Sequence, residues 1–342
     1  MVERILIVGL GSIGKRHLRL ARKLLPNADI RILRHKIATE VPNFANGCFF
    51  SIEEALAFMP NLAVIASPAV FHMSTAKILA EAGVHLLIEK PLSTSLDGIS
   101  LLVDSCQNRG TVISTGYNLR FSPSLQRYRD LINCGIVGRI LSVRCEAGQY
   151  LPSWRPDADY RTCVSARRDL GGGVLLELSH EIDYLRWIFG EIDWVKATLL
   201  RQSALEIDVE DTAHITLGFH ASSGERQLIA TLNLDFIRHD RTRSCMAIGE
   251  GGSLRWNGLN GEVDLYEANS TEWISLYRCS EDRDLTYKLE LESFLTAVEK
   301  NISPMVTGYD GLKVLEIIDL AQQSNASGGS IFKLASQTKA YL

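Results

Sequence analysis

Two short stretches of the sequence place acid–base residues side by side in patterns that suit proton transfer. In the first, Glu89, Lys90 and Pro91 follow the apolar run at 84–88, which predicts a buried strand. A lysine held at a strand end can stabilise negative charge on a reacting oxygen, while Glu89 balances its charge. Pro91 restricts the backbone of Lys90 and so fixes its direction. A surface turn with a solvated lysine stays equally open from this tripeptide alone.

The second stretch is GGGVLLELSHEID at 171–183, where three glycines precede a helical pattern that contains His180. Helical spacing places Glu177 one turn before His180 and Asp183 one turn after it, so either carboxylate can orient the imidazole. A histidine held by a carboxylate is the usual general acid–base. The glycines permit a close approach of the backbone to a ligand. We therefore interpret His180 as an acid–base residue rather than as a structural histidine.

The first 25 residues indicate the scaffold that positions these groups. An apolar run at 5–8 leads into Gly9-x-Gly11-x-x-Gly14, and a helical pattern follows directly. Strand, glycine turn and helix N-terminus together form the fingerprint of a dinucleotide site. Gly9 permits the turn, Gly11 lets the backbone approach the phosphates, and Gly14 lets the helix lie close to the strand. The sequence therefore predicts a Rossmann-type dinucleotide-binding domain.

The end of the second predicted strand, ADIRILRH at 28–35, bears on the choice of cofactor. An acidic residue that binds the adenosine ribose usually stands there and favours NAD. Here the strand carries no acid at its tip, and Arg34 occupies the expected position. Because a guanidinium can clamp a 2′-phosphate, we expect NADP as the cofactor, with NAD as the alternative. A solvated basic strand end is the other interpretation of Arg34.

The remaining pattern divides the chain into two predicted domains. Six strands alternate with helices up to residue 118, which predicts a doubly wound parallel sheet in a domain at 1–118. Residues 119–342 then show repeated extended runs and two closing helices, which predict an α+β domain with a large, mainly antiparallel open sheet. We expect the first domain to bind NAD(P) and the second to bind substrate and mediate oligomerisation, with a ligand cleft between them.

Composition excludes several classes of function. The formal net charge of −4 argues against a nucleic-acid-binding protein, which would be basic. The seven cysteines are scattered without a CxxC pair, so neither a disulfide framework nor a metal site is expected. No uninterrupted apolar stretch approaches the roughly 20 residues of a membrane helix. The sequence predicts a soluble cytoplasmic protein.

Six motifs in their order and spacing resemble the family of glucose–fructose oxidoreductase, inositol 2-dehydrogenase and MocA, over essentially the whole chain. They are GLGSIGKRH (9–17), SPAVFH (67–72), EKP (89–91), GYNLRF (116–121), GIVGRI (135–140) and GGGVLLELSHEID (171–183). The resemblance implies an NAD(P)-dependent oxidoreductase acting on a sugar, an inositol or a nucleotide-sugar-like alcohol or ketone. It implies that Lys90 polarises the reacting oxygen and that His180 donates or accepts the proton.

The family often has an aspartate four residues before this histidine, where the chain has Leu176 and then Glu177. Glu177 is therefore the first candidate for the third catalytic residue and Asp183 the second. With the glycine loop and Arg34, the expected cofactor-binding residues are Gly9, Gly11, Ser12, Ile13, Gly14, Arg34, Ser67, Pro68, His72, Glu89, Lys90, Asn118 and Arg120. The expected substrate-binding residues are Lys90, Trp154, Arg155, Tyr160, Arg161 and His180, although ordinary surface ion pairs would equally explain these arginines.

Two other functions remain compatible with the pattern: a non-catalytic NADP(H)-binding sensor, and an enzyme that recycles NAD while it cleaves a glycoside. The resemblance also implies a homo-oligomer, a dimer or a tetramer, that pairs through the open face of the second sheet. The alternating apolar residues of ATLNLDF at 230–236 suit such pairing, and equally suit packing against helices of the same domain.

Overall fold

The computed structural model describes residues 2–35, 40–154, 156–222, 224, 226–280 and 282–334. The chain forms two compact units, and both are discontinuous in sequence. Unit 1 contains Met1–Ser122, Asp169–Gly171 and Asp282–Leu315, and unit 2 contains Pro123–Arg168, Gly172–Glu281 and Glu316–Leu342. This division differs from the predicted single boundary after residue 118, because the segment from Asp282 returns to unit 1.

Unit 1 is built on a six-stranded parallel sheet in the order β3-β2-β1-β4-β5-β6, which confirms the predicted doubly wound sheet. Its strands are β1 (Arg4–Val8), β2 (Asp29–Leu33), β3 (Gly47–Phe49), β4 (Leu62–Ile65), β5 (His85–Glu89) and β6 (Ile113–Gly116). Its helices are α1 (Ser12–Leu24), α2 (Ile52–Ala57), α3 (His72–Glu81), α4 (Ile99–Asn108) and α8 (Leu285–Lys300).

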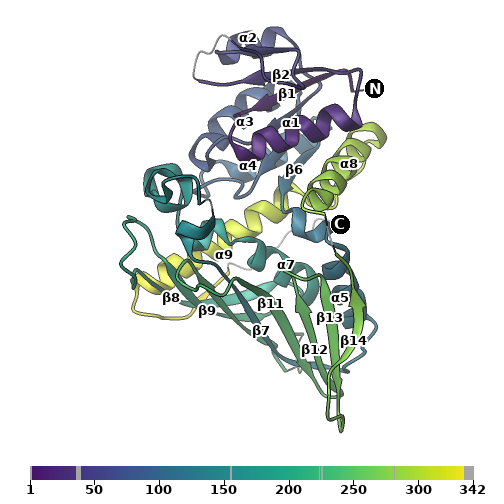
Figure 1. Ribbon diagram of the computed structural model, residues 1–342, viewed down its shortest axis with the longest axis vertical. Helices are drawn as coiled ribbons and strands as arrows, with labels where there is room; N and C mark the ends of the chain where they lie inside the picture. The colour runs from purple at the N-terminus through teal and green to yellow at the C-terminus, as the bar shows by residue number, and fades with distance from the viewer. Residues whose placement is uncertain are drawn as a thin grey trace. The chain divides into compact units, whose positions relative to one another are not determined.

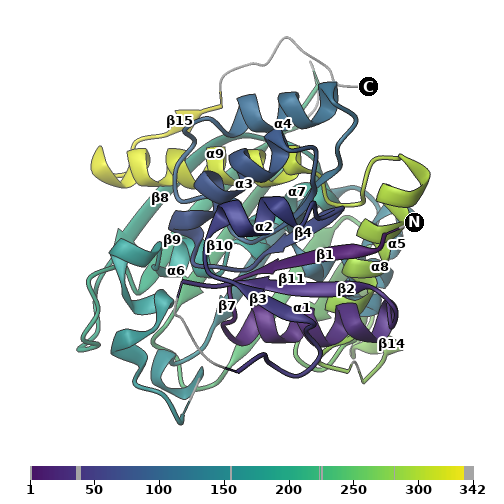
Figure 2. The ribbon, with the colours of Figure 1, turned by 90° about the horizontal axis from the view of Figure 1, so that it is seen from above.

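Helices cover both faces of this sheet, which explains why its central strands are continuously apolar. α1 and α8 pack on one face and α3 and α4 on the other (Figure 2). On the first face, Leu18 and Ala21 of α1 meet Phe294 of α8 in one buried cluster with Ile5 and Ile7 of β1. The helix that returns from the far end of the chain is therefore part of the dinucleotide-binding unit's core.

Unit 2 is built on a nine-stranded sheet in the order β14-β13-β12-β11-β7-β10-β9-β8-β15 (Figure 1). Its strands are β7 (Ile140–Gly148), β8 (Ile192–Leu200), β9 (Thr212–Phe219), β10 (Ile229–Asp235), β11 (Thr242–Gly249), β12 (Gly252–Asn257), β13 (Glu262–Glu267), β14 (Ile274–Arg278) and β15 (Phe332–Lys333). All neighbouring pairs are antiparallel except β7 and β10, which confirms the predicted mainly antiparallel sheet.

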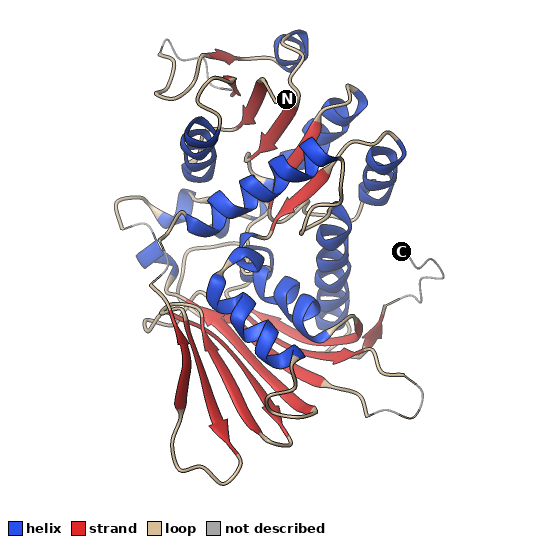
Figure 3. Ribbon diagram, turned by 90° about the vertical axis from the view of Figure 1, so that its right-hand side faces the viewer, coloured by secondary structure: helices blue, strands red, loops and turns tan. Residues whose placement is uncertain are grey.

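Helices of unit 2 lie on one face of this sheet (Figure 3). They are α5 (Pro123–Asn133), α6 (Val174–Glu177), α7 (His180–Phe189) and the second half of α9 (Gly308–Ala326). On β10, Ala230, Leu232 and Leu234 are buried within the single chain. The alternating residues of this strand therefore pack inside unit 2, which decides between the two interpretations of ATLNLDF. Among the residues described, no helix has both the length and the apolar character needed to cross a bilayer.

Candidate active site

The glycine loop after β1 has the geometry that a dinucleotide requires. Gly9 has a φ of +89°, and a Cβ there would lie 2.9 Å from the carbonyl oxygen of Ala66. A Cβ on Gly14 would lie 2.2 Å from the carbonyl oxygen of Gly9, so both glycines are required by close packing. A Cβ on Gly11 would have no described protein atom within 4 Å, so its surroundings are open for a ligand.

The start of α1 offers backbone donors to an anion. Gly11 occupies the N-cap position and has no side chain to bond the first N–H groups, and the first turn carries no acidic residue. Ser12 and Ile13, both predicted cofactor residues, open this helix. The strand order reverses between β1 and β4, and ligands of doubly wound sheets bind at that point. The loop and helix therefore fit the pyrophosphate of a dinucleotide.

Ser67 and Pro68 follow β4 at the same edge of the sheet. The backbone nitrogen of Ser67 would lie 2.9 Å from a Cβ on Gly9, so the two turns are in contact. The hydroxyl oxygen of Ser67 is buried and has no hydrogen-bond partner in the part of the chain that the structure describes. Both residues lie where the sequence predicts a cofactor contact.

Arg34 directly follows β2, as predicted. Its guanidinium donates to the carbonyl oxygen of Glu40 at 2.8 Å and lies 5.8 Å from the centre of the Phe50 ring. Lys36, two residues after Arg34, belongs to residues 36–39, which are outside the described residues. The strand end therefore carries a guanidinium at the place where an NAD-specific site carries a carboxylate.

Glu89 is the last residue of β5, and its side chain contacts protein groups on both sides. Its Oε1 lies 2.6 Å from Nε2 of His17, and its Oε2 accepts the backbone N–H of Lys90 at 3.2 Å. Burial alone would raise the pKa of this carboxyl, but the hydrogen bond from His17 and the charge of Lys90 lower it. Lys90 itself is half-buried at the carboxyl end of β5, where the sequence predicts it.

His72 was expected to line the cofactor, but its ring contacts two backbone carbonyls. Its Nδ1 lies 3.0 Å from the oxygen of Pro91, and its Nε2 lies 2.8 Å from the oxygen of Ser67. The ring is only 1% exposed. Desolvation lowers the pKa of this histidine and outweighs the backbone hydrogen bonds and the charge of Glu89, which raise it. The geometry gives His72 the role of joining the turn after β4 to the turn that carries Lys90.

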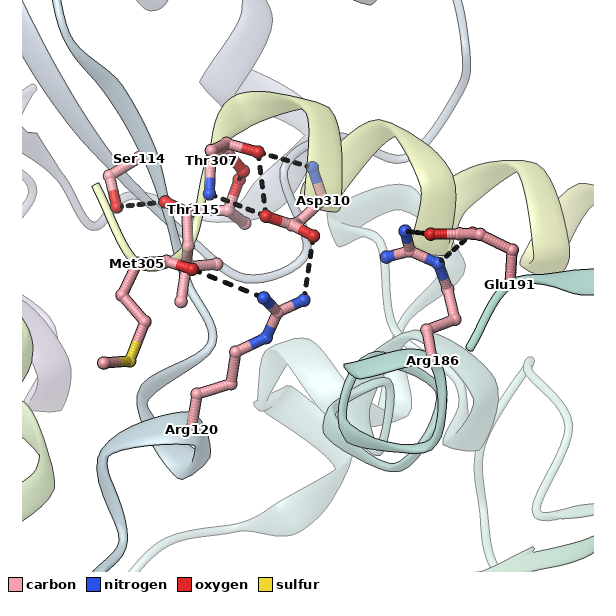
Figure 4. Close-up of polar contacts among 9 residues, drawn as sticks. Ser114, Thr115, Arg120, Arg186, Glu191, Met305, Thr307 and Asp310 are labelled. Atoms are coloured by element: carbon pink, nitrogen blue, oxygen red, sulfur yellow. Dashed lines mark hydrogen bonds and ion pairs between the residues drawn. The ribbon is translucent and has the colours of Figure 1, made fainter. Parts of the chain in front are cut away.

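Asn118 and Arg120 lie in a short turn, η2 (Asn118–Phe121), and both bind the returning segment of unit 1. Asn118 donates to the hydroxyl of Thr286 at 2.7 Å. Arg120 donates to the carboxylate of Asp310 at 2.9 Å and to the carbonyl oxygen of Met305 at 3.3 Å (Figure 4). These contacts are structural, and a cofactor contact of either residue stays a prediction.

His180 begins α7 in unit 2, and this corrects the predicted continuous helix. Leu178 and Ser179 interrupt the helical run, so Glu177 ends the separate helix α6. Glu177 and His180 therefore do not share one helix, and the role of Glu177 as the third catalytic residue stays a prediction. Ser179 precedes α7 with a helical backbone and caps no N–H group of it through its side chain, so no capping signal in the sequence marks the break. Asp183 lies in the first turn of α7, and it is buried like His180.

The three glycines before α6 pack against protein atoms. This corrects the prediction that they let the backbone approach a ligand. A Cβ on Gly171 would lie 2.4 Å from the Thr94 side chain, and one on Gly172 would lie 2.2 Å from the carbonyl oxygen of Val164. A Cβ on Gly173 would lie 2.4 Å from the carboxylate of Glu210. Close packing within each unit therefore explains these glycines.

Glu210 was missed by the sequence analysis. Its carboxylate accepts the backbone N–H of Leu175 at 3.1 Å, and its carbonyl oxygen accepts that of Val174. Burial raises the pKa of this carboxyl. Glu210 thus satisfies the first donors of α6, and nothing near it in the sequence signals this long-range contact. It also lines a pocket of unit 2 that contains none of the predicted substrate residues.

The predicted substrate stretch consists mainly of local contacts. Arg161 binds the carboxylate of Asp159 through two nitrogens and that of Glu206 through a third, with its side chain 54% exposed. Asp159 and Glu206 raise the pKa of Arg161 through hydrogen bonds. These bonds favour the interpretation of Arg161 as an ordinary surface ion pair. Tyr160 accepts the backbone N–H of Glu206, and Arg155 lies outside the described residues.

Trp154 is half-buried and held in place by neighbours in unit 2. Its indole N–H donates to the carbonyl oxygen of Gln149 at 3.0 Å, and its ring meets Phe236 edge to face. A fixed aromatic ring of this kind can support a sugar face, so its predicted role stays a prediction.

Two buried titratable groups beside the predicted catalytic residues were also missed. His17 contacts Glu89, next to Lys90, and Glu181, next to His180, is bound at 2.7 Å by Arg243 of β11. The signal for His17 was present in the sequence, since helical spacing places it with Leu18 and Ala21 on the buried face of α1. A polar residue at such a position usually has a specific partner.

Comparisons with known proteins match both units. Residues 3–117 match the model of the oxidoreductase family with an NAD-binding Rossmann fold, and residues 125–255 match the GFO/IDH/MocA C-terminal domain. The inositol 2-dehydrogenase of Rhizobium meliloti (strain 1021) is 25% identical over 340 residues, which cover 95% of this chain and 98% of that protein.

Solved structures share the fold over nearly the whole chain. A levoglucosan dehydrogenase in complex with NADH has a TM-score of 0.84 and 22% identity, covering 97% of this chain and 99% of its own. The WlbA dehydrogenase from Bordetella pertussis, in complex with NADH and UDP-GlcNAcA, has a TM-score of 0.80 and 23% identity. The match covers 98% of this chain and 100% of that one.

Proposed function

The chain belongs to the Gfo/Idh/MocA family of NAD(P)-dependent oxidoreductases, and we propose that it oxidises or reduces a ring hydroxyl or ketone of a sugar-like substrate. The observation that carries the proposal is the position of Lys90. The lysine leaves the carboxyl end of β5, two strands from the glycine loop after β1. Strand spacing puts these two points about 10 Å apart at one sheet edge.

A nicotinamide dinucleotide held at the glycine loop would supply the hydride chemistry, and the chain's own residues handle the proton and the charge. Lys90, balanced by Glu89, stabilises the negative charge that develops on the reacting oxygen. His180 gives or takes the hydroxyl proton. Asp183 replaces Glu177 as the first candidate for orienting His180, because it shares α7 with the histidine.

The substrate class is proposed from the relatives. One relative is named as acting on inositol, and two structural neighbours contain NADH and are named for levoglucosan or bound to UDP-GlcNAcA. These molecules share a saturated six-membered ring with several hydroxyl groups. We accordingly propose a cyclic polyol, a sugar or a nucleotide-linked sugar, with Trp154 as a surface for the ring. Arg34 supports NADP as the preferred cofactor.

The test is an absorbance assay of nicotinamide reduction, with NADP and NAD run separately over inositols, free sugars, sugar acids and nucleotide sugars. Keto-sugars with the reduced cofactors test the reverse direction. Once a substrate is found, Lys90→Ala and His180→Ala should each lose turnover by at least ~100-fold while reduced cofactor still binds. Lys77→Ala, which removes an exposed lysine of α3, is the matched control and should turn over normally.

Unchanged turnover in Lys90→Ala or His180→Ala would remove that residue from the mechanism. Binding of reduced cofactor without turnover across the panel would favour a sensor instead. Release of a sugar from a glycoside without net consumption of cofactor would favour the recycling chemistry.

A further inference from the structure

Behind Lys90, three buried titratable side chains from three elements of unit 1 converge. They are His17 of α1, Glu89 of β5 and Glu290 of α8, and one nitrogen or oxygen of each lies within 4.8 Å of the others. His17 is completely inaccessible, and the other two are nearly so. Tyr287 of α8 meets the His17 ring edge to face at 5.8 Å.

The contact between His17 and Glu89 is a hydrogen bond rather than two ligands of one metal ion. Nε2 of His17 and Oε1 of Glu89 are 2.6 Å apart. Two ligands bound to one divalent cation at about 2.1 Å, in tetrahedral geometry, would be roughly 3.4 Å apart. A shared proton fits the observed distance, which lies within the range of a charge-assisted hydrogen bond.

The tautomer of His17 follows from its other nitrogen. Within the described chain, Nδ1 of His17 is buried and has no hydrogen-bond partner. An unbonded lone pair costs less there than an unbonded N–H, so Nε2 carries the proton and donates it to Glu89. This arrangement keeps Glu89 ionised beside Lys90.

The carboxylate of Glu89 connects His17 to the lysine. While Oε1 accepts from His17, Oε2 accepts the backbone N–H of Lys90 at 3.2 Å. A Cβ on Gly116 of β6 would lie 3.0 Å from the same Oε2, so the neighbouring strand confines the carboxylate. The carboxylate is therefore held on three sides, by α1, by β6 and by the backbone that it orients.

We propose that His17 is a positioning residue for Lys90 and acts through the Glu89 carboxylate. His17 lies on the helix whose N-terminus begins at the glycine loop. The same rigid helix thus presents its first turn to the predicted pyrophosphate and fixes the lysine through its second turn. The inference rests on the proposed function, in which Lys90 acts on the reacting oxygen.

Loss of His17 has a defined electrostatic effect. Lys90, Glu290 and Tyr287 face the His17–Glu89 pair. Arg16 lies over the Tyr287 ring, and His72 interacts with Glu89 through its charge. Because burial raises the pKa of Glu89 and His17 opposes this, Glu89 takes up a proton at higher pH once His17 is gone. A protonated Glu89 no longer balances Lys90.

The test compares His17→Leu, which removes the donor, with His17→Gln, whose amide N–H can replace Nε2. Leu20→Ala is the control, because Leu20 is a buried residue of α1 and has no described contact with Glu89. The first readout needs no substrate: the rate of reductive methylation of the Lys90 amine against pH, followed by peptide mass spectrometry. The second is the pH profile of kcat for the substrate identified above.

We expect His17→Leu to change the methylation profile of Lys90 and to lose kcat by about 10- to 100-fold, with cofactor affinity kept. The acidic limb of its kcat profile should move to higher pH. His17→Gln should restore most of both readouts, and Leu20→Ala should alter only thermal stability.

An unchanged methylation profile in His17→Leu would overturn the inference whatever the substrate is, as would the same change in Leu20→Ala. A divalent metal that copurifies at one per chain and is lost in His17→Gln would also overturn it. If Lys90→Ala keeps full turnover, the proposed function fails, and the methylation profile still decides the link between His17 and Lys90.

Discussion

The Asp310 carboxylate allows a quantitative prediction, because each of its oxygens has a defined partner. Oδ1 accepts from Arg120 at 2.9 Å, and Oδ2 accepts from the backbone N–H and the hydroxyl of Thr307 at 2.9 and 2.8 Å (Figure 4). The Asp310 N–H donates back to the Thr307 hydroxyl. Thr307 and Asp310 thus form a capping box at the start of α9, and the Arg120 ion pair is added to it.

Asp310→Ala removes both functions of the carboxylate. The Arg120 side chain is 5% exposed and that of Asp310 is 19% exposed, so the variant leaves a largely buried guanidinium without its carboxylate. That loss costs about 2–3 kcal/mol, at or just below the lower limit for fully buried pairs because Asp310 is partly exposed, and the lost cap adds about 1 kcal/mol. The sum of about 3–4 kcal/mol corresponds to a fall in Tm of roughly 6–16 °C for a unit of this size.

Arg120→Ala should cost less, about 2 kcal/mol, because Asp310 keeps its bonds to Thr307. The stability lost in the double variant should be about 1–2 kcal/mol smaller than the sum of the losses in the two single variants. Differential scanning calorimetry gives Tm for the two single variants and the double variant. The fluorescence of the reduced cofactor reports cofactor binding in the same samples.

Glu250→Ala is the matched control. Glu250 accepts from Arg139 at 2.6 Å, and the two side chains are 53% and 48% exposed, so the loss should stay within about 1 kcal/mol. If Asp310→Ala shifts Tm no more than Glu250→Ala, the reasoning from burial is wrong. If Arg120→Ala abolishes cofactor binding and leaves Tm unchanged, the cofactor role predicted from the sequence holds instead.

Three further predictions concern the dinucleotide site and the folded state. Gly11→Ala should keep Tm, because its Cβ meets no described protein atom, yet weaken binding of reduced cofactor by ~10-fold or more. Gly173→Ala should lower Tm and leave cofactor binding unchanged, because Gly173 has a φ of +111° and the Glu210 carboxylate occupies the place of the new Cβ. Calorimetry and cofactor fluorescence on both variants check this, and two variants with equal effects would contradict it. Arg34→Ala should raise the Kd for NADPH by about 10-fold and leave that for NADH within about 2-fold, measured by fluorescence titration; equal effects on both would remove Arg34 from cofactor choice. His85 accepts the N–H of Val112 through Nδ1, and desolvation lowers its pKa from 6.5, so the unfolded chain binds more protons and stability should fall as pH drops below 6.5. In urea unfolding across this range, His85→Asn should flatten the dependence, and an unchanged slope would exclude His85 as its source.

The fold was predictable from local patterns, and so were the candidate site residues of unit 1. The apolar run before Gly9 and the lysine after β5 follow from strand and turn signals that act over a few residues. The surroundings of His180 in unit 2 depend on contacts between residues that are distant in sequence. Spacing along a helix predicted Glu177 beside His180, but the helix breaks at Leu178.

Long-range contacts also explain the glycines and charges that were misread or missed. Gly173 is required by Glu210, which is 37 residues away, and Glu89 is paired with His17, which is 72 residues away. No pattern within a window of one helix or strand contains such pairs. The buried face of α1 marked His17 as needing a partner, but only the sheet topology identifies that partner.

The return of α8 to unit 1 sets an order of events for the growing polypeptide. Leu291, Phe294 and Leu295 complete the cluster around Ile5 and Ile7, yet they are synthesised long after the six strands. At typical rates of translation, α8 follows β6 by about 10–35 s. Throughout that interval α1 alone covers its face of the nascent sheet, and the apolar surface that α8 later buries stays exposed to chaperones. A helix made after β7–β14 of the second sheet therefore completes the core of the unit that was begun first.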